Sequence, residues 1–451
     1  MQERILTLLE EKKFTELKNI LSEMNPADFV EYFEAVPRSQ LIVVFRLLSK
    51  ELAAEAFVEL DSDQQMYLIE SFTDKELTVV LSELFVDDFA DIVDEMPAVV
   101  AKRMLKNTDS ETRKTVNQIL DYPEDSAGSI MTTEYVDLKK SMTVSAAFDK
   151  IRKVGIDKET IYTCYVTESK RNLSGVVTAR QLMLADSDTI LSDIMDFDPI
   201  YAHTFDDKEY VVQLFDKYDM LALPIVDAEN RLVGIVTVDD AIDILQEATT
   251  EDIEKMAAIT PTEKPYLKMG VFELFRSRII WLLVLMVSAT FTGLIITSFE
   301  GALAGCVVLT AFMPMLMNTG GNSGSQASVT VIRALSLGEI EYHDTLKVLW
   351  KELRVSILCG VALSVLNFFK MWLFDILLLK TEGLTLVIAG IVSATLLLTV
   401  FIAKLVGCSL PIVAKKIGFD PAVMASPFIT TIVDAISLII YFLIASRVLD
   451  L

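Results

Sequence analysis

Apolar residues follow two different patterns along the chain. Up to about residue 128 they recur at the spacing of short amphipathic helices. From residue 279 onward they form long runs with little charge, and the first of these is the 21-residue stretch 279–299. A helix of that length crosses roughly 30 Å of hydrocarbon. The pattern therefore predicts an amphipathic first half followed by a membrane-spanning second half.

The apolar runs predict a transmembrane domain of five helices within residues 270–451. After the first span we expect further spans at about 301–317, 355–379, 384–410 and 423–446. The sequence NTGGNSGSQ after the second span is too polar to face lipid, so we expect a loop there, tolerated only where it is buried or lines a water-filled cavity. Lys and Arg gather before the first span, between the second and third, and between the fourth and fifth. This places the N-terminus in the cytoplasm and the C-terminus outside.

The amphipathic segments of residues 1–128 show a loose internal repeat. The segments NPADFVEYFEAVP (25–37) and FVDDFADIVDEMP (85–97) both place apolar residues at helical spacing, and both end at a proline. Short helices of this kind bury their apolar faces by stacking on neighbouring repeats. We therefore predict an acidic, all-α superhelical N-terminal domain.

The next part of the chain alternates strand-like and helical runs, and it does so twice. The segment YVTESKRNLSGVVTARQLMLAD (165–186) matches IVDAENRLVGIVTVDDAIDIL (225–245) in the order strand, turn, glycine, strand, threonine and helix. This doubled pattern resembles a tandem pair of CBS domains, which are α/β modules that respond to ligands. The two predicted units are residues 129–196 and 197–245.

The resemblance to CBS pairs also implies a nucleotide site. In such pairs a Thr and an Asp three residues later hold a ribose, and Thr237 and Asp240 match that spacing. Binding of ATP is therefore expected at the second unit, and a nucleotide-sensing membrane regulator without transport is one alternative function for the chain.

Charge separates the two halves of the chain. Residues 261–451 hold 14 Lys and Arg against 12 Asp and Glu, so residues 1–260 hold 26 against 52. A field this negative repels nucleic acid and attracts cations, which makes a metal ion or a basic protein the expected partner. A merely solubilising surface is the alternative interpretation of the charge.

A predicted helix within residues 239–264 connects the two halves. Its sequence DDAIDILQEATTEDIEKM carries seven carboxylates against one lysine before TPTEKP ends it. Like charges at i, i+3 and i+4 each destabilise an isolated helix by a few tenths of a kcal/mol. We therefore expect positive charge to lie against this helix.

Asp434 is the most informative residue of the membrane half. It lies midway along the last span with 12 uncharged residues on each side. A charge at that depth costs on the order of 2.5–3.5 kcal/mol, so it normally faces a polar interior or a water path. Magnesium suits such a site because it retains much of its water shell and needs one or two carboxylates. A symmetric dimer would supply two. The alternative is a buried ion pair with Lys404.

No enzyme chemistry is indicated. Four cysteines without CxxC spacing and two isolated histidines give neither a disulfide framework nor a zinc site. The glycine-rich run 320–324 lacks the Lys-Ser/Thr ending of a phosphate loop.

Together, the run GGNSGSQ followed by IRALSLGEI and the last-span segment DPAVMASPFITTIVDAISLIIYF resemble the MgtE family of magnesium channels and transporters. The order of the predicted domains is also that family's order. The resemblance implies a homodimer in the cell (inner) membrane, with a pore between protomers for Mg²⁺ and with Mn²⁺, Co²⁺ and Ni²⁺ as further candidate ions. It further implies that the acidic connecting helix is a plug that closes the pore when Mg²⁺ is abundant.

The resemblance assigns roles to particular residues. Those expected at the pore ion are Asp434, Asn318, Gly320, Gly321, Asn322, Gly324 and Gln326. Those expected to bind regulatory Mg²⁺ are Asp87, Asp91, Asp219, Asp240, Asp243, Glu251 and Asp420. Two positions depart from the family pattern, namely Lys404 in the fourth span and Ala248, where a plug-helix carboxylate is expected. A transporter that couples Mg²⁺ to another ion through Asp434 and Lys404 remains the alternative mechanism.

Overall fold

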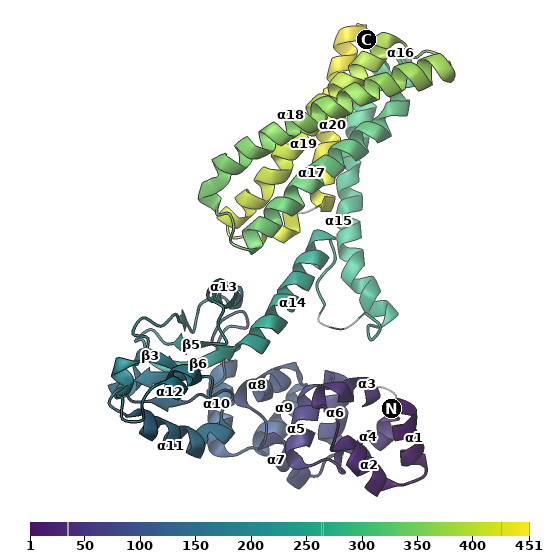
Figure 1. Ribbon diagram of the computed structural model, residues 1–451. Coiled ribbons are helices and arrows are strands. Elements are labelled where there is room, and N and C mark those ends of the chain that lie inside the picture. Colours follow the sequence, from purple (N-terminus) through teal and green to yellow (C-terminus); the bar gives the residue numbers. More distant parts are fainter. Residues whose placement is uncertain (34–35, 263, 265, 425, 451) are drawn as a thin grey trace. The chain divides into compact units, whose positions relative to one another are not determined.

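The computed structural model describes residues 1–450 apart from 34–35, 263, 265 and 425. It contains two compact units, Met1–Leu245 and Gln246–Leu451. The first unit consists of short helices and two small sheets, whereas the described part of the second is helical throughout (Figure 1). These features confirm the predicted fold class of a helical N-terminal part, an α/β pair and a helical membrane part.

The N-terminal part of the first unit is a stack of short helices. Their apolar faces share one core, in which Phe29, Phe57 and Phe89 are almost completely buried. Several helices begin at a side-chain cap, for example at Asp61 and Thr73, which satisfies backbone N–H groups that have no partner inside the helix. The helices are α1 (Gln2–Glu10), α2 (Phe14–Leu21), α3 (Phe29–Phe33), α4 (Arg38–Phe45), α5 (Lys50–Val58), α6 (Ser62–Ser71), α7 (Asp74–Leu81), α8 (Val86–Glu95), α9 (Ala98–Lys106) and α10 (Ser110–Leu120).

Two three-stranded sheets follow, with the same topology in both. In each, the first strand pairs in parallel with the second, and the second pairs antiparallel with the third. The first sheet comprises β1 (Asp137–Leu138), β2 (Thr163–Thr167) and β3 (Leu173–Thr178), with helices α11 (Val144–Val154) and α12 (Ala179–Leu184). The second comprises β4 (Ala202–His203), β5 (Ala222–Val226) and β6 (Leu232–Thr237), with α13 (Lys208–Tyr218) and the long α14 (Val238–Met256).

The two glycines that marked the sequence repeat occupy equivalent places. Gly175 pairs with Val166 in the first sheet and Gly234 pairs with Ile225 in the second. A Cβ at Gly175 would lie 2.4 Å from a backbone oxygen of Asp196, and the backbone of Thr132 approaches Gly234 in the same way. Both glycines are therefore required because another backbone segment passes close to the strand.

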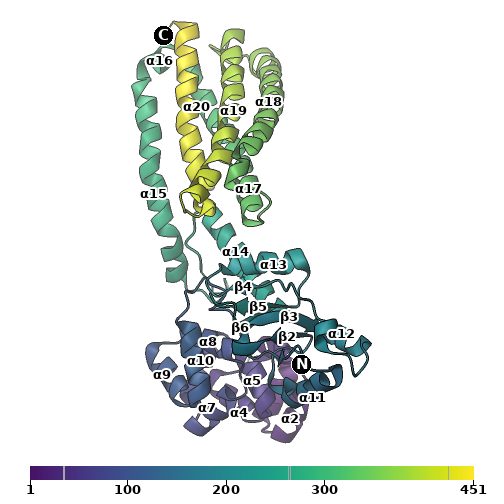
Figure 2. The same cartoon turned by 90° about the vertical axis from the view of Figure 1, so that its left-hand side faces the viewer.

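Long helices form the second unit, and α15, α17, α18, α19 and α20 run side by side in it (Figure 2). Among the described residues, four helical stretches are long and apolar enough to cross a membrane, and they coincide with the first, third, fourth and fifth predicted spans. The helices are α15 (Val271–Ser298), α16 (Glu300–Gly305), α17 (Met313–Ser336), α18 (Thr345–Lys370), α19 (Leu386–Lys416) and α20 (Ser426–Leu449), and a π-helical turn (Met371–Leu378) follows α18.

The predicted bounds of the second span, and the loop predicted after it, are wrong. Residues 300–312 form the short α16 and a 3₁₀ segment, and the polar run NTGGNSGSQ lies inside the continuous helix α17. Pro314 lies in the first turn of α17, where its missing N–H costs no hydrogen bond. In a membrane the backbone must satisfy its own hydrogen bonds, so a helix replaces the loop that these residues favour in water.

Small residues allow α17 to pack closely against α19 and α20. A Cβ on Gly407 would lie 2.2 Å from the carbonyl oxygen of Gly324, and a Cβ on Gly320 would meet Thr399 and Ser437. Close backbone contact at small residues is typical of membrane helices, where packing rather than the hydrophobic effect holds helices together. Because the glycine face of α17 is held against α19, this contact also determines which side chains of α17 point away from α19.

Replacement of Gly407 by alanine should therefore destabilise the membrane unit. The added methyl group must displace α17 or α19, and overpacking of this kind costs about 1–3 kcal/mol. Thermal unfolding of the protein in detergent measures the effect. Gly390→Ala on the same helix is the matched control, because a Cβ there meets nothing within 4 Å. An equal loss of stability in both variants would contradict the contact.

Candidate metal sites

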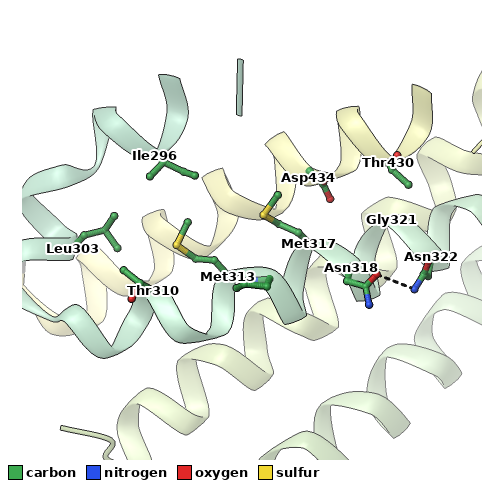
Figure 3. Close-up of a pocket in the computed structure, with 11 residues that line it drawn as sticks. Ile296, Leu303, Thr310, Met313, Met317, Asn318, Gly321, Asn322, Thr430 and Asp434 are labelled. Atoms are coloured by element: carbon green, nitrogen blue, oxygen red, sulfur yellow. Dashed lines mark hydrogen bonds between the residues drawn. The ribbon is translucent and has the colours of Figure 1, made fainter. Parts of the chain in front are cut away.

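Asp434 lines an open cavity in the membrane unit. The cavity has a volume of about 660 Å³, and its walls come from α15, α16, α17, α20 and the 3₁₀ segment before α17. Its polar lining includes Asp434, Asn318, Asn322, Thr430 and Thr310 (Figure 3). The half-buried side chain of Asp434 thus forms part of the cavity wall.

Helix α17 supplies most of the remaining polar surface of the cavity. Asn318 and Asn322 are one turn apart, and the Asn322 amide donates to Asn318 Oδ1 at 3.3 Å (Figure 3). Gly321 lies between them and packs against Thr430 of α20. Amide oxygens and a carboxylate are ligands that a hydrated Mg²⁺ accepts, either directly or through its water shell.

Three residues expected at the pore ion are placed elsewhere. Gly320 and Gly324 are buried against α19 and α20, where they allow close packing. Gln326 is exposed and is not part of the cavity wall. Because α17 is helical, the backbone carbonyls of this segment are engaged in its own hydrogen bonds and do not form an ion-binding loop.

Lys404 does not pair with Asp434. It is 5 % exposed on α19 and lies outside the cavity, and no ion pair within 4 Å that the structure shows for the described residues involves either side chain. Lys404 and Glu352 of α18 both lie near Cys408. The alternative of a buried Asp434–Lys404 pair is therefore not observed.

A second group of carboxylates is buried in the first unit. Asp87 and Asp88 begin α8, Asp240 begins α14, and Glu159 precedes β2. One carboxylate oxygen of Asp87 and one of Glu159 are buried without a hydrogen-bond partner. Orphaned buried oxygens of like charge are costly, and a bound cation offsets that cost.

Burial and mutual repulsion raise the pKa values of this acidic cluster, defined here as Asp87, Asp88, Glu159 and Asp240. Burial, followed by repulsion from Asp240 and Asp88, raises the pKa of Glu159 to about 8. The same two causes raise the pKa of Asp88 to about 6, and they raise the pKa values of Asp87 and Asp240 as well. The cluster is therefore disfavoured in its fully ionised form unless positive charge is present.

The acidic cluster includes residues that the sequence did not single out. Asp87 and Asp240 were expected as metal ligands, whereas Asp88 and Glu159 were not. Asp88 directly follows Asp87 and could have been found by its position, but Glu159 lies in a loop and meets the others only through the tertiary fold. No group of three or more His, Cys, Asp or Glu side chains in the described ranges is close enough to hold one ion directly.

The remaining acidic residues expected to bind metal in the first unit are exposed. Asp91 lies one turn beyond Asp87 on α8, and Asp243 lies one turn beyond Asp240 on α14. Asp219 ends α13 in a left-handed conformation with φ of 50°. All three residues lie at the surface of the first unit.

The last turns of α14 belong to the second unit and contain a lysine between two acidic residues. Lys255 Nζ lies 2.5 Å from Glu251 Oε1 and 2.5 Å from Asp420 Oδ2. Burial alone would lower the pKa of Lys255, but the hydrogen bonds to Asp420 and Glu251 keep it raised. The positive charge expected against this acidic helix is thus supplied by the helix itself. Ala248 is half-buried on the same helix.

Thr237 and Asp240 are arranged as a pair at the start of α14. The Thr237 hydroxyl donates to Asp240 Oδ2 at 2.5 Å, and the Thr237 backbone N–H donates to the same oxygen at 3.3 Å. At the equivalent place in the first sheet, Thr178 forms a capping box with Gln181. The first repeat therefore lacks the carboxylate that the second repeat presents.

Comparison with known proteins covers almost the whole chain. The model of a family described as divalent cation transporter (MgtE) matches residues 313–444, and the MgtE intracellular N domain matches residues 24–125. CBS domains match residues 127–188 and 191–247. The chain is 36 % identical to the magnesium transporter MgtE of Thermus thermophilus over 98 % of this chain and 97 % of that one. It is 33 % identical to the magnesium transporter MgtE of Bacillus subtilis over 98 % and 96 % of the two chains.

Solved structures resemble the first unit. A crystal structure of the cytosolic domain of the Mg²⁺ channel MgtE in complex with ATP is 36 % identical, covers 54 % of this chain and all of its own, and gives a TM-score of 0.52. The soluble part of a magnesium transporter is 27 % identical, covers 55 % of this chain and 97 % of its own, and also gives 0.52.

The raised pKa values of the acidic cluster predict how stability of the first unit depends on pH. The folded state binds protons that the unfolded state releases near pH 4, so in EDTA the stability is greatest at low pH and is lost as pH rises through about 6 to 8. The melting temperature of residues 1–245, followed by circular dichroism, should fall by about 2–4 °C for each kcal/mol lost.

Glu159→Gln should flatten that pH dependence, because the neutral amide removes one buried charge. Glu168→Gln is the matched control, since Glu168 is exposed and its pKa is lowered by the hydrogen bond to Lys140. If stability instead rises from pH 6 to pH 8, the buried carboxylates do not repel one another as described.

Proposed function

Because the chain belongs to the MgtE family of magnesium transporters, we propose that it carries Mg²⁺ through a pore between two copies of itself and that Mg²⁺ bound to its acidic first half closes that pore. The observation that supports this function best is the cavity around Asp434. It joins a carboxylate deep in an apolar helix to the amides of Asn318 and Asn322. An isolated carboxylate at that depth is costly unless it serves an ion or water path.

The number of charges at the cavity supports a dimer. One protomer offers Asp434 as the carboxylate of the cavity wall, and a divalent ion is better matched by two. The cavity is also open, so in the proposed dimer the second copy completes its wall and brings a second Asp434 to the two-fold axis. Thr430, Asn318 and Gly321 then contact the water shell of the passing ion. These contacts select among ions by the size and hydration of each ion.

Regulation by Mg²⁺ is supported by the acidic cluster of the first unit. Asp87, Asp88, Glu159 and Asp240 come from α8, the loop before β2, and α14, so their repulsion opposes the packing of these three segments. The orphaned oxygens of Asp87 and Glu159 fit a divalent cation that retains waters. Shifting a two-state population from 1:99 to 99:1 takes roughly 5.5 kcal/mol, which several weak sites supply together.

The proposed location is the cell (inner) membrane, with the acidic half in the cytoplasm and the C-terminus outside. Most of the Lys and Arg residues that flank the membrane helices lie on one side, for example Arg276, Arg278, Lys415 and Lys416. The further ions to test beside Mg²⁺ are Mn²⁺, Co²⁺ and Ni²⁺. Passive flow is favoured over coupled transport because Asp434 and Lys404 do not form the ion pair that a charge relay would use.

Replacement of Asp434 by asparagine should abolish magnesium transport. The amide keeps the shape of the side chain but removes the charge that attracts the divalent ion, so growth rescue of a magnesium-auxotrophic host should fall to the level of the empty vector. Uptake of Mg²⁺ into liposomes containing the purified protein gives the same comparison without the host.

Asp375→Asn is the matched control for this experiment. Asp375 is a carboxylate of the membrane unit that pairs with Lys370 at 2.8 Å and lies outside the cavity. Its replacement should leave transport near the wild-type level. Normal growth rescue by the Asp434 variant would refute the pore assignment.

A nucleotide site in the second CBS unit is the further function that the geometry favours. The hydrogen-bonded pair of Thr237 and Asp240 has the residue types expected to hold a ribose, and the similar cytosolic domain was solved in complex with ATP. Since Asp240 also belongs to the acidic cluster, nucleotide and cation would share one side chain. ATP is therefore proposed as a ligand of the first unit.

Thr237→Ala should weaken ATP binding by about tenfold or more, because it removes one hydrogen-bond partner and frees Asp240 to move. Titration calorimetry on the first unit measures the affinity. Thr178→Ala tests the equivalent position of the first repeat, and it should leave the affinity unchanged because Gln181 stands in place of the aspartate. Equal effects of the two substitutions would contradict the assignment.

A further inference from the structure

The end of α14 is fastened to membrane helices by contacts within the second unit. Met256 packs against Ile332 of α17 and against Ala422, which lies in the short turn before α20. Asp252 accepts a hydrogen bond from the Ser336 hydroxyl at 2.9 Å, at the end of α17. Lys255 joins these contacts through its ion pair with Asp420. The last turns of α14 are therefore docked on α17 and on the short turn before α20, and both of these helices line the cavity.

Lys255 provides the positive charge of this docking contact. Its ammonium is bound by one carboxylate from its own helix, Glu251, and by one from the membrane segment, Asp420, each at 2.5 Å. The Lys255 side chain is 24 % exposed and the Asp420 side chain 34 % exposed, so water screens the pair only in part. A lysine ammonium is a compact charge with three donors, which suits a position between two carboxylates.

The acidic residues at this contact already have partners. Asp420 uses Oδ2 for Lys255 and accepts the Ala422 backbone N–H with Oδ1 at 2.7 Å. Glu254 Oε2 accepts the Thr262 backbone N–H at 2.9 Å. Glu251 and Asp420 were expected to hold a regulatory Mg²⁺, but with Lys255 between them the two carboxylates do not fit that role. This contrasts with the orphaned oxygens of Asp87 and Glu159.

We propose that Lys255 is a tethered counter-cation that replaces a divalent ion between Glu251 and Asp420 and so docks the end of α14 on the membrane helices without metal. The proposal rests on the proposed function, because it concerns how the pore is regulated. It divides that regulation into two parts. Docking of the α14 end is independent of Mg²⁺, and the response to Mg²⁺ is left to the acidic cluster of the first unit.

Hydrogen–deuterium exchange on the full-length protein in lipid nanodiscs tests this proposal. Peptides covering residues 250–262 are compared in EDTA and in millimolar Mg²⁺. The wild-type protein should show slow exchange in both conditions, because the ammonium is always present. Lys255→Met keeps the length of the side chain and removes the charge, so exchange in EDTA should rise by about tenfold. Mg²⁺ should then restore slow exchange by bridging the two freed carboxylates.

Three further variants make the result specific. Lys255→Arg keeps the charge and should behave as the wild type. Lys264→Met removes a lysine that pairs with Glu273 at 3.1 Å elsewhere in the linker, and it should leave peptides 250–262 unchanged. Asp420→Asn retains the acceptor for Ala422 but removes one carboxylate, so exchange should rise in EDTA and should not be restored by Mg²⁺.

Two outcomes would overturn the proposal. Unchanged exchange of Lys255→Met in EDTA would mean that the ion pair is a surface contact without a docking role. Fast exchange that Mg²⁺ does not restore would mean that the lysine supports helix packing rather than replacing a cation. The readout does not require ion flow, so it remains valid whatever the Asp434 variant shows. A failure of the proposed transport function and a failure of the proposed role of Lys255 can therefore be told apart.

Discussion

Repulsion between carboxylates is the constraint on which the acidic half of this protein depends. Residues 1–260 carry 52 acidic side chains against 26 basic ones, and some of the acidic ones are brought together by folding. At the acidic cluster, the repulsion is visible as raised pKa values and oxygens without partners. At the end of α14, a lysine of the same helix offsets it. The two places meet the same cost in different ways. Carboxylate oxygens of Asp87 and Glu159 lack partners at the first place, whereas Lys255 lies between two carboxylates at the second.

The membrane unit solves a related problem in an apolar medium. Asp434 is tolerated on α20 because α17 presents amides to the same cavity, and α17 can do so because its opposite face carries glycines that pack against α19 and α20. The polar and the small residues of one sequence run therefore have different tasks. Gly320 and Gly324 serve the packing face, whereas Asn318 and Asn322 serve the cavity face.

The parts that the sequence predicted well are those with a local signal. The CBS repeat was visible because Gly175 and Gly234 occupy equivalent strand positions where another backbone segment passes close by. The long spans were visible as uncharged runs. The polar run of α17 was mistaken for a loop because glycine and asparagine favour loops in water, a preference that the bilayer removes. Glu159 and the Lys255–Asp420 contact were missed because tertiary folding alone brings their partners near; Lys255 and Asp420 are 165 positions apart.

Helix α15 is held by protein on few sides. Of its residues Val271–Ser298, all of which are described, Ser277 is the one that is buried. Its uncharged stretch is about 30 Å long, close to the thickness of the hydrocarbon layer, so a thinner or thicker bilayer is accommodated by a change of tilt or by deformation of the lipid around it. Ile296 near its C-terminal end forms part of the cavity wall. The lipid composition of the membrane thereby becomes one of the determinants of the shape of the space in front of Asp434.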